Sequence, residues 1–174
     1  MLAAILFYAS LSSGFASDGC RPNRLTETIQ ALSFATENEG SETSPTVHYK
    51  WLILSQDPTE RVGIAVYEVI GEEMSIEFLS VDEEFRGRGL SRLLLSSILE
   101  EHPNIQRIKA SLTDDNLAAF ESNYRVLEED QDLFTPCSRA VRGTPAMRIR
   151  TSLGFSTILT CVRTNASVEL VVRR

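Results

Sequence analysis

The 174-residue sequence predicts an α+β fold, a single domain built around one mixed central β-sheet flanked by helices. The first observation is a row of strand-like runs, rich in β-branched and aromatic residues, at 48–55, 61–70 and 74–81. The second is a change to helical periodicity at 90–102. The third is another strand pattern at 106–113, directly after that helix. Together they predict a three-strand meander followed by a strand–helix–strand crossover.

The first twenty residues, 1–20, form an apolar segment that fits two interpretations. The stretch MLAAILFYASLSSGFAS ends in small residues, as a secretory signal peptide does, but no positive charge precedes the apolar run. It can equally be a first helix packed on the core. Serines and a glycine interrupt it, so no membrane span is expected. We therefore expect the folded domain over 21–174 in a cytoplasmic protein, with export as the alternative.

Between this segment and the meander, the sequence predicts a short amphipathic helix and then a loop. Apolar residues recur at helical spacing over 24–34. The stretch 35–46 is polar and contains a proline, which is typical of a loop. No strand is expected before residue 47.

Turn residues and a stop signal predict the connections. Asp57-Pro58 lies between the first two strand runs and Gly71 ends the second, which favours antiparallel hairpins. Pro103 stops the helix that follows the meander. A strand that returns after a helix should lie parallel to the strand before that helix, through a right-handed crossover.

The C-terminal part predicts one more helix and a closing hairpin. Asn116, which follows two aspartates, is a good N-cap for a helix through LAAFESNYRVLEE. Residues 153–172 contain two strand runs separated by Asn165-Ala166. Because an unpaired edge strand invites pairing with another chain, this hairpin could join a second copy of the protein in a homodimer.

Charge and cysteine content argue against several classes of function. The net charge of −7 argues against general affinity for nucleic acid, and it either suits a cationic substrate or reflects only solubility. Cys20, Cys137 and Cys161 lie far apart, and no histidine stands at ligand spacing, so no metal site is expected. An odd number of cysteines defines no disulfide framework, and buried neutral thiols are expected instead.

The stretch RGRGLS, residues 86–91, lies between a strand and a helix and is a candidate anion site. The first backbone N–H groups of a helix lack partners, and the helix dipole favours an anion there. Gly87 and Gly89 have no Cβ, so a diphosphate could approach the backbone. Arg86 and Arg88 could add charge-assisted contacts. The stretch matches neither the P-loop nor the dinucleotide fingerprint, and it is either a phosphate cradle or only a tight turn that starts a helix.

The segment LSVDEEFRGRGLSRLLL resembles the acetyl-CoA signature of the GCN5-related N-acetyltransferases, the GNAT superfamily. The Arg-x-x-Gly-x-Gly/Ala pattern falls on Arg86, Gly89 and Ser91, where Ser91 replaces the usual Gly or Ala but is small. The preceding strand ends in the apolar pair Leu79 and Val81, as in the family. The order of elements is also similar from residue 48 onward, over roughly seven tenths of the chain. The resemblance implies a GNAT-like fold and an acetyltransferase.

In the family, an amine attacks the thioester of acetyl-CoA directly, and no acyl-enzyme forms. The resemblance therefore implies acetyl-CoA as co-substrate and either a small-molecule amine or a protein amino group as acceptor. Backbone N–H groups around Leu79 to Val81 are expected to stabilise the oxyanion. The residues implied to hold CoA are Leu79, Val81, Arg86, Gly87, Arg88, Gly89, Leu90, Ser91 and Asn116.

Two side chains are candidates for the proton transfers. Glu77 lies in an otherwise apolar strand, on the face that alternation assigns to Leu79 and Val81. Partial burial there would raise the pKa of Glu77 toward the working range of a general base; a solvated carboxylate, with water chains as the base, is the alternative. Tyr124, in the helix after Asn116, is the candidate acid for the departing thiolate, or else a half-buried helix residue.

One departure from the family pattern concerns this tyrosine. Of the family's Tyr-x-x-Leu-Gly-Phe run, the chain has Leu153-Gly154-Phe155, but Arg150 stands at the place of the tyrosine and Tyr124 lies far before it. Either 125–151 is an insertion over the substrate groove, or Tyr124 is not the family tyrosine. The alternative function is a catalytically inactive GNAT-like binding or regulatory domain. The acceptor and the length of the acyl chain have no readable signal in the sequence.

Overall fold

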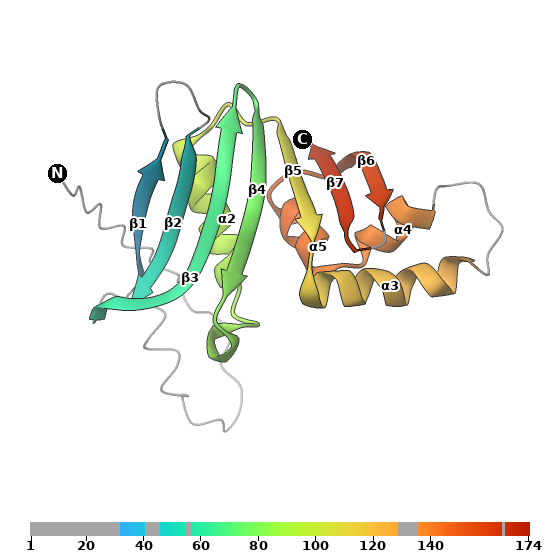
Figure 1. The fold of residues 1–174 in the computed structure, drawn as a ribbon, viewed down its shortest axis with the longest axis horizontal. Coiled ribbons are helices and arrows are strands. Elements are labelled where there is room, and N and C mark those ends of the chain that lie inside the picture. The colour runs from blue at the N-terminus through green and yellow to red at the C-terminus, as the bar shows by residue number, and fades with distance from the viewer. Residues whose placement is uncertain (1–31, 41–45, 55–56, 129–135, 165) are drawn as a thin grey trace, which may run out of the picture.

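The computed structural model describes residues 32–40, 46–54, 57–128, 136–164 and 166–174. Within these ranges a seven-stranded mixed sheet has the order β1-β2-β3-β4-β5-β7-β6, which confirms the predicted α+β fold (Figure 1). The strands are β1 (Leu32–Glu39), β2 (Val47–Leu54), β3 (Asp57–Ile70), β4 (Glu73–Val81), β5 (Arg107–Leu112), β6 (Thr157–Arg163) and β7 (Val168–Arg173). The helices are α2 (Leu90–Glu101), α3 (Asp114–Glu128), α4 (Pro136–Arg142) and α5 (Pro145–Ser152). No helix in the described ranges is long and apolar enough to cross a membrane.

The middle of the sheet follows the predicted order. β2, β3 and β4 pair antiparallel as a meander, and β5 pairs parallel to β4 after α2. Figure 1 shows α2 lying behind β2 to β4. The apolar side of α2 joins the core there, and its buried residues are Leu90, Leu94, Leu95, Ile98 and Leu99. The crossover therefore covers one face of the meander.

The prediction for the region before the meander was wrong in the part that the structure describes. Leu32–Glu39 is a strand, where the sequence predicted the end of a helix and the start of a polar loop. β1 pairs antiparallel with β2 along its whole length. This pairing gives a polar segment the backbone hydrogen bonds that it cannot form locally, so it overrides a weak strand propensity. Residues 1–31 and 41–45 lie outside the described residues.

The connection between β2 and β3 also differs from the prediction. β3 begins at Asp57, so Asp57-Pro58 is part of the strand and does not separate it from β2. The register between the two strands shifts around Ile53. A proline is tolerated at the start of a strand or beside such an irregularity, because no ladder N–H is needed there. Gly71, by contrast, turns β3 into β4 as predicted, with a φ of 60°.

A lysine lies in the core between β2 and α2. The side chain of Lys50 is fully buried, and its Nζ is 2.6 Å from Oε1 of Glu101, at the end of α2. The Glu101 side chain is half-exposed, at 47%. The pair thus joins a buried ammonium group to a carboxylate that stays in contact with water.

We expect the two partners of this pair to respond differently to substitution. Glu101→Ala should lower the free energy of unfolding by about 1–3 kcal/mol, because it leaves the buried ammonium group of Lys50 unpaired. Lys50→Met should be close to neutral, since it replaces the buried charge with an apolar chain of similar length. Urea unfolding of both variants measures the difference. Equal losses in the two variants would contradict it.

Two of the three cysteines form a disulfide, so the prediction of free thiols was wrong. Cys137 of α4 is bonded to Cys161 of β6, with Cα atoms 5.9 Å apart. The two residues are separated by 24 positions in the sequence. They meet only because α4 packs against the C-terminal hairpin, which local sequence does not reveal. Cys20 lies outside the described residues.

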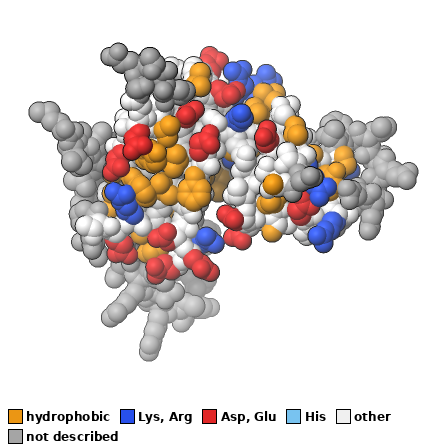
Figure 2. Space-filling model, in the orientation of Figure 1, with side chains coloured by type: hydrophobic (Ala, Val, Ile, Leu, Met, Phe, Trp, Pro, Cys, Tyr) orange, Lys and Arg blue, Asp and Glu red, His pale blue; other side chains and the backbone are white. Residues whose placement is uncertain are grey.

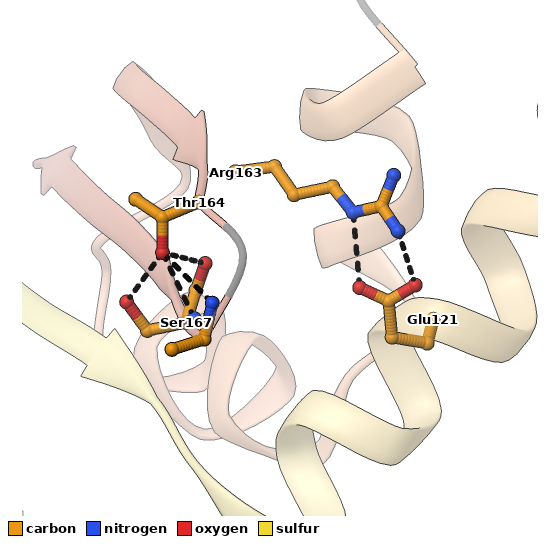
Figure 3. Close-up of polar contacts among 5 residues, drawn as sticks. Glu121, Arg163, Thr164 and Ser167 are labelled. Carbon is orange, nitrogen blue, oxygen red and sulfur yellow. Dashed lines mark hydrogen bonds and ion pairs between the residues drawn. The ribbon is translucent and has the colours of Figure 1, made fainter.

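Polar contacts hold the C-terminal hairpin to α3 (Figure 3). Arg163 of β6 donates from Nε and Nη2 to the two carboxylate oxygens of Glu121, at 3.0 and 2.8 Å. The turn is closed by the N–H of Ser167, which donates to Oγ1 of Thr164 at 3.0 Å. The predicted hairpin of β6 and β7 is confirmed. β6 lies at the edge of the sheet, where a strand of a second copy could pair with it. Homodimer formation through β6 stays a prediction.

Candidate functional site

β4 and β5 separate along their length, and a cavity lies in the split. Their parallel pairing ends at Ile76 opposite Ala110. Directly after this point β4 has an extra residue: Ile76 and Phe78 oppose consecutive residues of β3, and Glu77 has no partner there. A bulge of this kind bends a strand. Figure 1 shows the two strands diverging toward the end at which α2 and α3 begin.

The cavity has a volume of about 400 Å³. Its walls come from the second half of β4, the glycine loop before α2, the end of β5 with the start of α3, and α5. The predicted cofactor-binding residues that line it are Leu79, Val81, Arg86, Gly87, Gly89, Leu90, Ser91 and Asn116. Beyond Ile76 the edge of β4 no longer pairs with β5. Its backbone groups on that side can therefore pair with an extended ligand that enters the split.

The glycine loop has the backbone conformation of an anion cradle. Gly87 and Gly89 have φ values of 76° and 77°, in the left-handed region that favours glycine. At both positions no atom lies within 4 Å of the place that a Cβ would take, so the space in front of the loop is open. Gly89 is the N-cap of α2, and the first amide groups of this helix have no partner within it. These donors meet the positive end of the helix dipole at the cavity.

The two arginines of the loop differ in position. Arg86 donates from Nε to the carbonyl oxygen of Val81 at 3.1 Å, and its Nη1 is 3.4 Å from Oδ2 of Asp115 in α3. It thus joins the glycine loop to the start of α3 at the wide end of the cavity. Arg88 instead donates from Nη2 to the carbonyl oxygen of Glu84 at 2.7 Å and is absent from the cavity lining. Arg86 therefore lines the cavity and Arg88 does not, and the contact of either residue with a bound anion stays a prediction.

Asn116 lines the cavity, but the prediction that it caps α3 was wrong. The helix begins at Asp114, and the N–H of Asn116 donates to the carbonyl oxygen of Thr113 at 3.1 Å. The side-chain Oδ1 of Asn116 accepts the N–H of Ala146 at 2.8 Å. Asn116 therefore holds the start of α5 against the start of α3 at the cavity.

The two predicted proton-transfer residues lie in different surroundings. Glu77 lines the cavity at the bulge, but its side chain is exposed, so the expectation of partial burial was wrong. The bulge changes the alternation on which that expectation rested. Tyr124 is absent from the cavity lining: its ring packs on Phe120, with centroids 5.4 Å apart, and the Arg163 guanidinium lies 4.5 Å from its centroid.

Arg150 of α5 is a polar residue of the cavity wall that the sequence did not predict as a site. Its side chain is 5% exposed, and burial lowers its pKa to about 10. Its Nε has no hydrogen-bond partner. The N–H of Phe155 donates to its carbonyl oxygen at 2.9 Å, so the Leu-Gly-Phe run closes the end of α5. The only signal in the sequence was that Arg150 stands three residues before Leu153, at the tyrosine position of the Tyr-x-x-Leu-Gly-Phe pattern that the chain resembles in part.

An open apolar surface lies beside the cavity on the face of the sheet opposite α2. Figure 2 shows apolar side chains gathered over β2 to β4, with mostly acidic and some basic side chains around them. Phe78, which lines the cavity, is 48% exposed, and Ile70 of β3 is 66% exposed. The cavity is thus continuous with a surface that is apolar and has a border that is mostly acidic.

The chain matches one family model and is similar to several solved structures. The model of a family described as "Acetyltransferase (GNAT) family" matches residues 24–122. No curated protein matches the chain. Among solved structures the chain is similar to the ribosomal-protein-S18-alanine N-acetyltransferase from Escherichia coli, with 16% identity and a TM-score of 0.47 over 77% of this chain and 69% of that one. It is also similar to an acetyltransferase from Thermus thermophilus, with 19% identity and a TM-score of 0.44 over 76% and 66% of the two chains. A protein from Bacillus anthracis str. Ames, solved in complex with acetyl coenzyme A, is 14% identical, with a TM-score of 0.46 over 76% and 64%.

Proposed function

The chain belongs to the GNAT family of acetyltransferases, and from this premise we propose that it transfers the acetyl group of acetyl-CoA directly to an amine. The observation that carries the proposal is the open glycine loop at the start of α2, beside the split between β4 and β5. A loop with two left-handed glycines and free helix N–H groups can hold the diphosphate of CoA. The unpaired edge of β4 can hold the amide-bearing arm that follows the diphosphate.

The residues around the cavity have separate roles in the reaction. Gly87, Gly89 and Ser91 supply the backbone of the cradle, and Arg86 adds a positive charge at its border. The N–H groups in the free part of β4, around Leu79, are the candidate donors for the oxyanion that forms during the attack. Calorimetric titration with acetyl-CoA tests the cradle, since saturable binding supports the proposal and a lack of binding would refute it.

Glu77 is the proposed general base, because it lines the cavity at the bulge and its exposed carboxylate can accept the proton of the amine. We expect Glu77→Gln to lower kcat by about 100-fold, the usual scale for a lost general base, with the Kd for acetyl-CoA unchanged. Initial rates with a reactive amine measure this effect. The control is Glu169→Gln, which removes an exposed carboxylate of β7 outside the cavity lining. An unchanged kcat in Glu77→Gln would mean that water, and not this side chain, takes the proton.

The proposed acceptor is a cationic amine with an apolar body. The apolar surface at Phe78 and Ile70 leads to the cavity, and most of the charged side chains at its border are acidic. Such a surface attracts a positively charged molecule and buries its apolar part. A set of amines of equal length that differ in charge and apolar area tests this preference. Faster acetylation of anionic amines would contradict it.

A second candidate, an exported GNAT-like binding or regulatory domain, has one observation in its favour. The Cys137–Cys161 disulfide is of a kind that persists in oxidising compartments and is rare in the cytoplasm. Acetyl-CoA binding distinguishes the two candidates, because a domain that acts outside the cytoplasm has no need of a working cradle. Mass spectrometry of the protein from its own cells, with free thiols blocked, tests whether the disulfide is present there.

A further inference from the structure

Arg150 is a buried cation with no part in the cradle or in the proton transfer assigned to Glu77. Its side chain is 5% exposed, and the structure shows neither an ion pair nor a hydrogen bond from its guanidinium to any residue in the described ranges. With its pKa at about 10, it is positive at neutral pH. A buried charge without a partner lowers stability. Its position in the cavity wall therefore points to an anion that arrives with the ligand.

The wide end of the cavity is already provided with groups for an anion. The glycine loop follows β4, and α3 follows β5, so both lie where the two strands have diverged. Arg86 and the free amide groups of α2 are found there. These groups can bind the diphosphate of CoA at the wide end of the cavity. The thioester end of CoA should therefore lie farther along the split.

Arg150 lies toward the narrow end of the split. α5 begins beside α3, because Asn116 binds the N–H of Ala146. From Ala146 to Arg150 the helix rises by about 6 Å, or roughly one turn. After α5, Thr157 of β6 is level with Arg107, the first residue of β5, since both oppose Arg173 of β7. α5 thus runs from the end of β5 back toward its beginning, and Arg150 is one turn farther in than Ala146.

We propose that Arg150 is the anion-binding residue for the thiolate of CoA, the group that leaves when the amide forms. The inference rests on the proposed function. The amine nitrogen forms a bond to the carbonyl carbon, the carbon–sulfur bond breaks, and its electron pair goes to sulfur. The ammonium proton goes to Glu77 or to water, and the products are the amide and CoA thiolate. Arg150 pairs with that negative charge from the wall of the cavity, one turn farther along α5 than Ala146.

Binding of CoA at different pH values tests this role without any acceptor. A free thiol has a pKa of about 8.5, and a guanidinium beside it lowers that pKa. Bound CoA should then release a proton, so its affinity should rise with pH until the free thiol also ionises. We expect the affinity of the wild-type protein for CoA, relative to acetyl-CoA, to rise about tenfold between about pH 6.5 and about pH 8.5. Acetyl-CoA has no ionisable thiol and supplies the reference.

Three variants separate the charge of Arg150 from its packing. Arg150→Met should abolish the rise with pH and leave the affinity for acetyl-CoA within about threefold, a change of about 0.7 kcal/mol. Arg150→Lys keeps the cation and should retain part of the rise. Arg148→Met, at an exposed position of α5 outside the cavity lining, should behave as the wild type. Arg150→Met should remain folded, because an apolar chain in place of an unpaired buried charge does not destabilise a core.

The following results of binding and rate measurements would overturn the role proposed for Arg150. Equal weakening of CoA and acetyl-CoA by Arg150→Met would assign the residue to the diphosphate and overturn the inference. A wild-type protein that binds both ligands with no difference in pH dependence would overturn it as well. If Arg150→Met lowers only the rate of acetylation of acceptors that carry a carboxylate, Arg150 binds the acceptor and the inference is wrong. A wild-type protein that binds neither ligand refutes the proposed function instead, so the two failures are distinguishable.

Discussion

A Gly89→Glu variant is expected to bind acetyl-CoA at least about 100-fold more weakly than the wild-type protein, corresponding to the loss of about two charge-assisted hydrogen bonds. Gly89 is the N-cap of α2, and the space in front of its Cα is open. A glutamate there places a side chain and a negative charge where the diphosphate should lie. Its φ of 77° also disfavours any residue with a Cβ, by about 1–2 kcal/mol. Calorimetric titration with acetyl-CoA measures the loss.

The chain offers a matched control in Gly71→Glu. Gly71 also has a left-handed φ, of 60°, and open space around its Cα, but it lies in the turn between β3 and β4 and does not line the cavity. The same residue with the same charge is introduced, and a similar loss of stability is expected from the backbone. Gly71→Glu should therefore bind acetyl-CoA like the wild-type protein. If both variants bind normally, the loop before α2 is only a turn.

Among the changes predicted for this protein, reduction of the Cys137–Cys161 disulfide should lower the free energy of unfolding most. The bond closes a loop across 24 positions, and loop-closure entropy for this length corresponds to about 3–4 kcal/mol. For a chain of this size, such a loss lowers Tm by about 10 °C. Thermal unfolding with and without a reducing agent measures it. α4 should be affected most, because the bond joins this short helix to β6.

Cysteine variants show whether this bond alone is responsible for the loss of stability on reduction. The double variant Cys137→Ser/Cys161→Ser should unfold at the temperature of the reduced wild-type protein and should not respond to the reducing agent. Cys20→Ser retains the pair and should lose the same stability on reduction as the wild type. An equal Tm for the oxidised and reduced wild-type protein would contradict the stabilising role and remove the support for an oxidising compartment.

The sequence predicted those parts of the fold and site that depend on neighbouring residues. Strand runs and the helical period of 90–102 located β2 to β5 and α2, because side-chain alternation is a local property. Gly87 and Gly89 were recognisable for the same reason: left-handed backbone before a helix needs glycine whatever the surroundings. The glycine loop was therefore recognisable in the sequence before its position in the fold was known.

Contacts between distant segments decided the rest. β1 is a strand only because β2 pairs with it, and Cys137 meets Cys161 only because α4 packs on the hairpin. The bulge at Glu77 exposed a side chain that simple alternation would bury, since it depends on the register against β3. By itself the sequence determined the kind of domain and the place of the glycine loop that precedes α2. Only the tertiary structure decided that Arg150, and not Tyr124, lines the cavity, because burial and the lack of a partner depend on how separate elements pack together.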